Sequence, residues 1–243
     1  MAQEVFNRYE HKYLIDKKTY EKLIPILEKY MELDRYNEGR KPYTISNIYY
    51  DTKDDYLIRK SLDKPSYKEK LRLRAYGVPN KDTKVFLEIK KKFNGLVNKR
   101  RTALSLSEAY DFTKTGKKPA QKEYMNMQVS KEIEYFLKMY KLFPKLYLAY
   151  DRIAYFGKED AELRISFDTN IRTRRYDVRL ERGDYGTRLL EKDVYLMEIK
   201  TSLAKPLWLT NALSGLCIKR VNFSKYGTEY KKHLTEEIFA EAM

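Results

Sequence analysis

A regular alternation of apolar and charged residues constrains this chain more than any other feature of its sequence. In EKLRLRAYG (69–77), the apolar residues Leu71, Leu73 and Ala75 fall on one side of an extended chain, and basic residues fall on the other. The same two-residue period recurs in VFLEIKKK (85–92), ELRISFD (162–168) and VYLMEIK (194–200). One such strand is typical of a sheet with a wet face, but the repetition indicates that several charged faces meet at a shared site.

The order of the predicted elements favours a single domain, which we expect to span residues 1–243. A length of 243 residues suits one sizeable core. An amphipathic helix is predicted over 16–33, with Asp16 as its N-cap. A helical insert is predicted at about 105–143, and helices follow Pro206 and Ser224. Strands are predicted over 43–52, 67–76, 84–92, 93–104, 145–156, 162–169 and 193–201.

The charge balance predicts an anionic partner. Fifty Lys and Arg against 35 Asp and Glu give a formal net charge of +15 and a sequence pI of about 9.5. Nucleic acid, polyphosphate, nucleotides and anionic lipid all satisfy that count. Cys217 is the only cysteine, and no apolar run approaches the roughly 20 residues that span a bilayer. We therefore expect no intrachain disulfide, no membrane span and a cytoplasmic location.

The fate of the two strand faces predicts the fold class. The helices need apolar strand surface to pack against, so the charged faces must point away from them. If the sheet closes on itself, the charged faces line a lumen. We therefore expect an α+β protein built on a closed antiparallel β-barrel flanked by helices. Such a lumen is costly when empty, because like charges repel and buried ions lose water, so it needs an anion inside.

Seven segments carry a family resemblance in order and with suitable spacing. They are RYEHKYLI (8–15), LRLRAYG (71–77), FLEIKKKFNGLVNKRR (86–101), YDRIAYF (150–156), LRISFDT (163–169), LMEIKTS (196–202) and FSKYG (223–227). Together they resemble the polyphosphate polymerase (VTC) domain of the triphosphate tunnel metalloenzyme superfamily. The resemblance implies a tunnel that binds triphosphate or polyphosphate, with Mn²⁺ or Mg²⁺ held by glutamate.

The resemblance also implies roles for individual residues. Phosphate contacts are implied for Lys12, Arg72, Arg74, Lys90, Lys99, Arg152, Arg164, Ser224 and Lys225. Arg100 or Arg101 is an alternative to Lys99. Ser224 and Lys225 also suit phosphate because they begin a predicted helix, whose free N–H groups favour an anion. A catalytic role is implied for Lys12, Arg72, Arg74, Lys90, Arg152, Arg164, Lys200 and Lys225.

Glu198 matches the metal-binding glutamate of the family, and Glu10 and Glu88 are further candidates. For Glu88, pairing with an arginine is an equal alternative. The first strand departs from the Glu-x-Glu-x-Lys pattern of tunnel triphosphatases, because Arg8 stands where they have the first glutamate. That departure favours the polymerase branch over the hydrolases.

The expected activity is transfer of the ATP γ-phosphate to a growing inorganic polyphosphate chain. Triphosphate and pyrophosphate are further expected ligands, and nucleic acid is not the preferred one. The first alternative is an inorganic or nucleoside triphosphatase of the same fold. The second is a non-catalytic protein that binds polyanions or RNA, which would leave Glu198 without a purpose.

Overall fold

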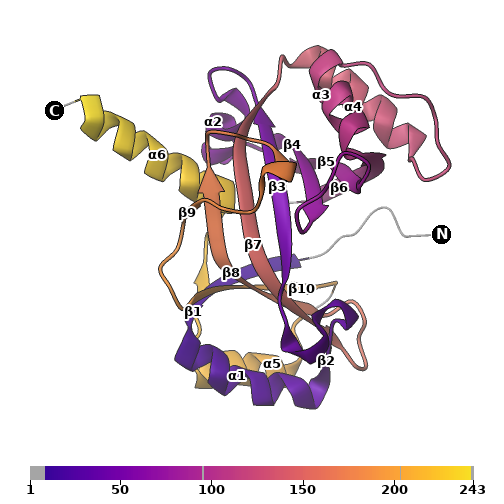
Figure 1. Cartoon of the computed structure of the whole chain (residues 1–243). Helices are drawn as coiled ribbons and strands as arrows, with labels where there is room; N and C mark the ends of the chain where they lie inside the picture. The colour runs from indigo at the N-terminus through magenta and orange to yellow at the C-terminus, as the bar shows by residue number, and fades with distance from the viewer. Residues whose placement is uncertain (1–8, 95, 203, 242–243) are drawn as a thin grey trace.

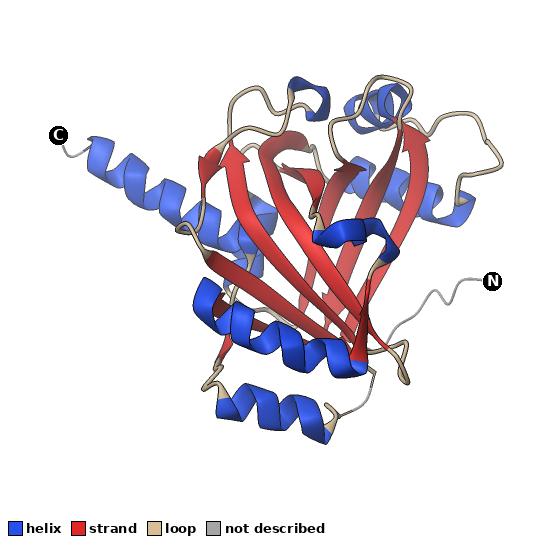
Figure 2. Cartoon of the chain, turned by 60° about the horizontal axis from the view of Figure 1, so that its bottom comes forward, coloured by secondary structure: helices blue, strands red, loops and turns tan. Residues whose placement is uncertain are grey.

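The computed structural model describes residues 9–94, 96–202 and 204–241. Its strands pair antiparallel in one large sheet, which accounts for most of the fold (Figures 1 and 2). The strands are β1 (Tyr9–Asp16), β2 (Met31–Leu33), β3 (Tyr43–Asp51), β4 (Tyr67–Tyr76), β5 (Lys84–Phe93), β6 (Leu96–Ser105), β7 (Phe143–Gly157), β8 (Arg164–Arg174), β9 (Thr187–Arg188), β10 (Val194–Thr201) and β11 (Arg220–Val221).

The sheet is curved but open, so the prediction of a closed barrel is wrong. Its strand order is β11-β1-β10-β8-β7-β3-β4-β5-β6, with β2 on β7 and β9 on β8. Within the described part of the chain, no backbone pairing joins β6 to β1 or β11. Strands must approach to about 4.8 Å to pair. Instead, a cavity that includes Lys12, Lys90 and Lys92 separates these edges, and these like charges oppose a closer approach.

The helices begin and end where local chemistry predicts. They are α1 (Lys17–Tyr30), α2 (Tyr56–Leu62), α3 (Leu106–Thr115), α4 (Met127–Met139), α5 (Leu207–Gly215) and α6 (Lys225–Glu241), with 3-10 turns at Arg35–Arg40 and Leu180–Arg182. Asp16 caps α1 by accepting from the Thr19 N–H at 2.7 Å. Ser105 and Glu108 form a capping box on α3, which ends at Gly116 in the left-handed region, with φ 71°.

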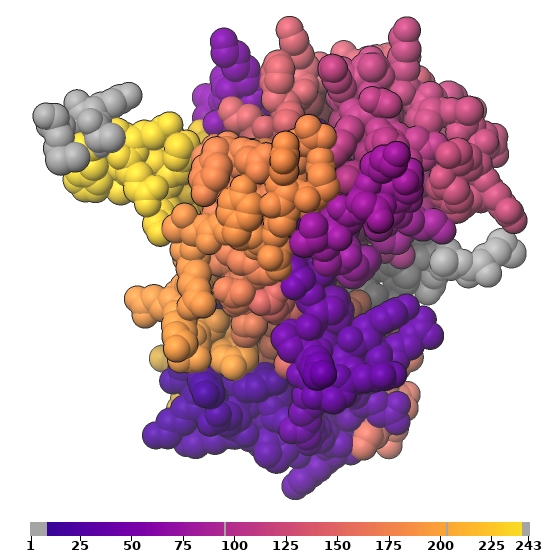
Figure 3. Space-filling model, viewed as in Figure 1, coloured from indigo at the N-terminus to yellow at the C-terminus, as the bar shows by residue number. Residues whose placement is uncertain are grey.

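Two apolar cores form on the outer, convex face of the sheet. Helices α3 and α4 cover one core, which contains Leu71, Leu73 and Leu87 from β4 and β5. Helices α1 and α5 cover the other, beneath β1, β8 and β10. The two helix pairs lie at opposite ends of the molecule, the magenta α3–α4 surface at the top and the indigo α1 surface at the bottom (Figure 3). The alternating strands thus bury their apolar faces as predicted.

The concave face is divided between apolar and charged residues. At one end, Tyr226 and Tyr230 at the start of α6 pack against Ile45, Tyr49 and Leu196 of the sheet. The sequence pattern did not predict that the last helix would begin inside the curve of the sheet. The rest of the concave face carries the charged residues, and the C-terminal part of α6 extends away from the body (Figure 1).

Two sequence expectations concern the start of the chain and membrane-spanning helices. Arg8, which replaces the first glutamate of the hydrolase pattern, lies outside the described residues. Among the helices of the described ranges, none combines the length and the apolar character needed to cross a membrane.

Candidate functional site

The predicted site residues on the strands share the concave face. Alternation and strand register bring them together: Glu10 lies opposite Lys200, and Lys12 lies opposite Glu198. On the other side of the sheet, Arg72 lies opposite Glu88, and Lys90 lies between Lys70 and Lys99. Arg152 and Arg164 project from β7 and β8 with the same parity. The prediction that these basic and acidic residues form one group agrees with this arrangement.

Glu88 organises the arginine end of the face. Its fully buried carboxylate contacts the Arg72 Nε at 2.5 Å, the Lys99 Nζ at 2.8 Å and the Arg74 Nε at 3.8 Å. Burial opposes its charge, but the three cations outweigh burial and hold the pKa of Glu88 well below its usual value. Of the two sequence interpretations of Glu88, arginine pairing is the one seen. We name these four residues the Glu88 group.

Additional polar contacts fix the two arginines of the Glu88 group. The Arg74 Nε donates to the Asn47 Oδ1 at 3.0 Å, and its Nη2 donates to the Tyr150 hydroxyl at 3.1 Å. The Arg72 Nη1 donates to the Tyr49 hydroxyl at 3.4 Å. Both guanidinium groups are therefore held in place before any ligand arrives.

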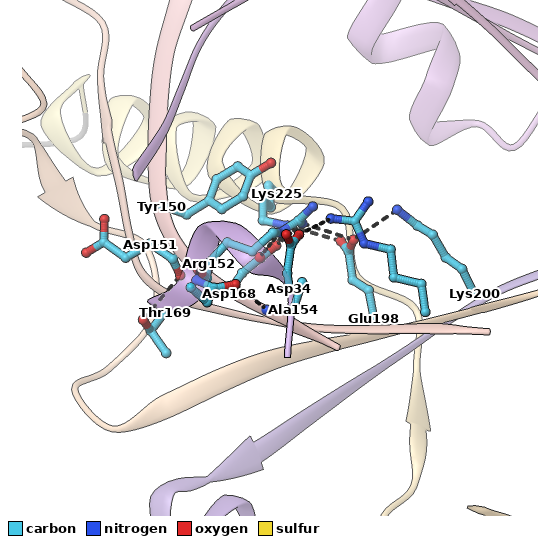
Figure 4. A network of polar contacts seen from close by, with 12 residues as sticks. Asp34, Tyr150, Asp151, Arg152, Ala154, Asp168, Thr169, Glu198, Lys200 and Lys225 are labelled. Carbon is cyan, nitrogen blue, oxygen red and sulfur yellow. Dashed lines mark hydrogen bonds and ion pairs between the residues drawn. The ribbon is translucent and has the colours of Figure 1, made fainter. Parts of the chain in front are cut away.

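Glu198 organises the opposite side of the face (Figure 4). Its oxygens lie 3.1 Å from the Lys225 Nζ, 3.4 Å from the Arg152 Nη2, 3.5 Å from the Lys12 Nζ and 3.8 Å from the Lys200 Nζ. Burial raises the pKa of this carboxyl, but the four cations together lower it well below its usual value. Glu198 is therefore ionised and surrounded by positive charge.

Asp168 is the central residue that sequence reasoning missed. It is fully buried, accepts from the Arg152 Nε at 2.6 Å and Nη2 at 2.8 Å, and contacts the Lys225 Nζ at 2.5 Å. Arg172, an arginine of the same strand as Asp168, pairs instead with Asp151 and Asp184. Parity places Asp168 on the same strand face as Arg164 and Ser166, but it does not identify the partners of Asp168.

Glu10 completes this side of the face next to the cavity. The Lys12 Nζ lies 3.3 Å and the Lys200 Nζ 3.8 Å from its oxygens, so both lysines lie between Glu10 and Glu198. Burial and Glu198 raise the pKa of Glu10, but Lys200, Lys12 and Lys90 lower it to about 2. We call Glu10, Lys12, Arg152, Asp168, Glu198, Lys200 and Lys225 the Glu198 group.

Three further predicted phosphate ligands are Ser224, Arg164 and Lys99, and the structure places each of them as follows. The Ser224 Oγ accepts from the Gly227 N–H at 3.2 Å, so it caps α6 while also lining the cavity. Arg164 lies over the Phe156 ring, at 4.9 Å from its centroid, and 3.7 Å from Asp34. Lys99 is on the concave face, whereas Arg100 contacts Glu132 on the outer face. Arg101 shares the face of Lys99 and lies over Phe86.

A cavity of about 790 Å³ adjoins the Glu198 group, of which Glu10 and Lys12 line it. Its lining includes the predicted residues Glu10, Lys12, Lys90 and Ser224, so the charged face is accessible from this side. It also includes Lys68, Lys70 and Lys92, which sequence reasoning did not select. The sequence could have identified them, because residues two apart on a strand share one face. Each of the three lies two residues from a selected position or from another member of this set.

The donor set suits a divalent cation only in part. Glu10 and Glu198 place two carboxylates on neighbouring strands of one face, and carboxylate oxygen is a ligand that Mg²⁺ and Mn²⁺ prefer. Among the described residues, no group of three or more acids, histidines or cysteines is placed to hold a metal. A cation bound here fits a site in which one or two carboxylates are supplemented by substrate phosphate oxygens.

The arrangement is suited to binding and neutralising a polyanion. It presents fixed guanidinium and ammonium groups on one face, near two carboxylates that suit a cation. It offers no Ser–His or Cys–His pair for nucleophilic catalysis among these residues. Its fixed cations suit phosphoryl chemistry, in which positioning and charge neutralisation dominate.

Comparisons with known proteins agree with this geometry. Residues 7–234 match the model of the VTC domain. Among solved structures, a candidate adenylate cyclase from Bacillus halodurans matches with 16% identity and a TM-score of 0.54, covering 91% of this chain and 96% of its own. A candidate adenylyl cyclase from Hippeastrum, described as having a dominant triphosphatase activity, matches with 16% identity and a TM-score of 0.50, covering 92% and 95%.

A search of curated proteins found no match. The likeness to the two solved structures shows a shared fold, and the domain match covers nearly all of the described residues. The chain therefore belongs to the VTC domain family, and it shares its fold with these two solved structures.

Proposed function

We propose that this protein is a metal-dependent polyphosphate polymerase, which transfers the γ-phosphate of ATP to the end of an inorganic polyphosphate chain. The observation that carries the proposal is the pairing of two buried acidic centres, Glu88 and Glu198, with seven different Lys and Arg side chains on one concave face. A site so rich in fixed cations suits a substrate with several adjacent phosphates.

The basic residues bind and orient both substrates. Arg72 and Arg74, held by Glu88, would contact the phosphates along one wall. Arg152 and Lys225, held by Asp168, would contact them along the other. In this arrangement the terminal phosphate oxygen of the chain attacks the γ-phosphorus of ATP, and the bond between that phosphorus and the β,γ-bridging oxygen breaks. ADP leaves, and the chain gains one phosphate.

No general base is required in this reaction. The attacking oxygen belongs to an ionised phosphate, so it carries no proton that must be removed. Developing charge on the leaving ADP needs nearby cations, which the two walls supply. This accounts for a reaction centre built from arginine, lysine and glutamate.

Glu198, with Glu10 beside it, would hold a divalent cation in the loaded enzyme. Mg²⁺ or Mn²⁺ bound there would neutralise charge on the phosphate oxygens. Arg164, Lys90, Lys99 and the Ser224 end of α6 remain proposed phosphate contacts. Lys200 remains a proposed catalytic residue, and both Lys12 and Lys200 lie close to the two carboxylates.

A triphosphatase is the alternative with the most support, because the Hippeastrum protein of similar fold is described as having that activity. It needs a positioned water as the nucleophile, and that water must lose a proton. Among the described residues of the two groups, each carboxylate contacts Lys or Arg, which leaves no unengaged carboxylate to act as a base. We therefore favour phosphate over water as the acceptor.

Product analysis tests the proposal. Purified protein is incubated with ATP and Mn²⁺, and products are resolved on a gel stained for polyphosphate while free phosphate and ADP are assayed. A ladder of chains with ADP and little free phosphate is the expected result. Free phosphate without chains would establish the triphosphatase. Neither product, together with polyanion binding that persists in EDTA and falls steeply with salt, would establish a binding protein.

A further inference from the structure

Four lysines form a row on the concave face beyond the arginines. Lys70 and Lys68 continue the inward-facing positions of β4 after Arg74 and Arg72, and cross-strand register places Lys90 opposite Lys70 and Lys92 opposite Lys68. All four line the cavity of about 790 Å³. We call Lys68, Lys70, Lys90 and Lys92 the lysine row. Like charges directly opposite each other destabilise a sheet, so the arrangement needs a compensating anion.

The described residues provide no carboxylate partner within ion-pair distance for Lys68, Lys70, Lys90 or Lys92. The Lys68 Nζ donates to the Ser61 carbonyl at 3.0 Å, and the Lys70 Nζ lies 5.8 Å from the centre of the Tyr226 ring. On the outer face of the same strands, Lys91 contacts both Glu69 and Glu132. Lys91 on the outer face is therefore paired with carboxylates, whereas the lysine row on the concave face has no carboxylate in ion-pair contact within the described residues.

Burial makes this lack of compensation more costly. Loss of water, followed by the fields of Lys90, Lys68 and Lys12, lowers the pKa of Lys70 to about 7, and only Asp51 acts in the other direction. Arg220 and Asn94 line the same cavity, and Glu10, whose charge acts on Lys90, is the one acid among its described lining residues. The row is therefore a positively charged surface that faces an accessible space.

The row also extends the site beyond the length of a triphosphate. Successive residues of an antiparallel strand are about 3.4 Å apart, so Arg74 and Lys68 lie roughly 20 Å from each other along β4. Three linked phosphates cannot span that distance, whereas a longer linear chain can contact the arginines and lysines at once. Basic residues recur at every second position of β4 from Arg74 to Lys68, and cations at such a regular spacing suit a linear polyanion with a regular charge spacing.

We propose that the lysine row is a subsite for the part of an inorganic polyphosphate chain that extends beyond the first three phosphates, and that it gives the protein a preference for long chains. The inference rests on the proposed function, since it assigns the polyphosphate chain to this side of the concave face. The row guides the chain through the cavity between β6 and β1, where the sheet is open.

Binding of two probes to a double variant tests the inference. Lys68→Met with Lys92→Met removes the outer pair of the row and keeps the length of both side chains. The matched control is Lys18→Met with Lys22→Met, which removes the same charge from exposed positions on α1. Affinities for inorganic triphosphate and for long-chain polyphosphate are measured by calorimetry, with circular dichroism to establish that each variant is folded.

The row variant should bind long-chain polyphosphate roughly tenfold more weakly, because two direct contacts are lost. Its affinity for triphosphate should change by no more than about twofold, as should both affinities of the control, since only a screened long-range field is altered. The salt dependence of long-chain binding should also weaken, with its logarithmic slope falling by roughly two.

Each of the other outcomes of the binding experiment contradicts one specific part of the proposal. If the row variant loses affinity for both probes equally, or no more than the control, the row is not a subsite for long chains. If the unmodified protein binds long chains no more tightly than triphosphate, the proposed preference is wrong although the proposed function stands. If it binds neither probe, the proposed function itself fails.

Discussion

The two halves of the β4–β5 pair are similar in sequence but differ in how they balance charge. In the inner half, Arg72 and Arg74 share the buried carboxylate of Glu88. In the outer half, Lys70 and Lys90 lie directly opposite each other with no carboxylate in ion-pair contact within the described chain. The strand register that places Glu88 opposite Arg72 thus places lysine opposite lysine two residues further along.

This difference separates two requirements of a polyanion site. A buried guanidinium needs a permanent partner, because an uncompensated charge in the interior destabilises the fold. A lysine beside an accessible cavity tolerates the lack of one, because water solvates it in part until a ligand arrives. The inner half is therefore organised in advance, whereas the outer half is completed by its ligand.

Among the variants that test this difference, a replacement of Glu88 should have the largest effect on stability. Glu88→Gln keeps the shape of the side chain but leaves Arg72, Arg74 and Lys99 without their shared anion. We expect the free energy of unfolding to fall by about 3–5 kcal/mol in denaturant titrations. Long-chain polyphosphate should recover part of the loss, because its charge replaces the carboxylate.

Glu132→Gln is the matched control for Glu88→Gln. Glu132 contacts Lys91 and Arg100 on the outer, more solvated face of β5 and β6. This change should cost about 1 kcal/mol or less. Equal destabilisation by the two variants would contradict the view that the buried carboxylate organises the inner half.

Replacing Glu198 tests the opposite wall, with the next largest effect. Glu198→Gln should lower metal-dependent turnover by about 10²-fold or more, because it removes the proposed metal ligand. Metal titrations of turnover should show that the dependence on Mn²⁺ concentration shifts. Glu236→Gln, an exposed change on α6, should leave turnover within about twofold. Full metal-dependent turnover in Glu198→Gln would contradict the proposed mechanism.

Adding a carboxylate to the outer half should make it resemble the inner half. Lys70→Glu places a negative charge opposite Lys90 and next to Lys68, two of the lysines whose fields act on this position. We expect the protein without ligand to gain about 1 kcal/mol of stability, which corresponds to a rise in melting temperature of roughly 2–4 °C. Polyphosphate affinity should fall. A less stable variant would indicate that repulsion between the lysines is not what weakens this half.

The pH dependence of Lys70 gives the smallest expected effect. Its pKa falls from 10.5 to about 7 on folding, so between these values the unfolded chain binds more protons than the folded protein. Stability without ligand should therefore rise as pH increases through this range, and Lys70→Met should reduce that rise. Thermal melts from pH 6 to 9 measure it. An identical pH dependence in Lys70→Met and the unmodified protein would contradict the assignment.

The same titration predicts how ligand binding responds to pH. An anion favours the charged form of Lys70, so binding above pH 7 takes up a proton and affinity should fall as pH rises. Calorimetry in buffers of different ionisation enthalpy measures this uptake. Because the ligand stabilises the charged form of Lys70, polyphosphate should stabilise the unmodified protein more than Lys70→Met. The difference in the free energy of unfolding between the two proteins should therefore be smaller with polyphosphate than without it.

Much of the fold could be predicted because strand alternation and helix caps are local signals. The expected strand 67–76 coincides with β4, and Asp16 and Ser105 cap the helices that follow them. Closure of the sheet could not be predicted in the same way, because it depends on contacts between its distant edges. The prediction of one domain with a helical insert remains a prediction, although α3 and α4 lie within 105–143.

The placement of Arg72, Glu198 and Lys12 on one face of the sheet was predictable, because parity and family resemblance agreed, and their roles stay predictions. Asp168 was missed because its partners, Arg152 and Lys225, come from β7 and from the start of α6. A carboxylate whose partners come from separate segments of the chain gives no spacing signal. Lys68, Lys70 and Lys92 were missed for a different reason, because lysines that alternate along a strand are also typical of a solvated face until a cavity is seen beside them.

A crystal structure of the protein with inorganic triphosphate and Mn²⁺ tests the central claim most directly, that the concave face holds a phosphate chain between the Glu88 and Glu198 groups. We predict phosphate density in contact with Arg72, Arg74 and Arg152, and an anomalous manganese signal beside Glu198. Triphosphate bound elsewhere, or a concave face that keeps its internal ion pairs at saturating ligand, would contradict the account.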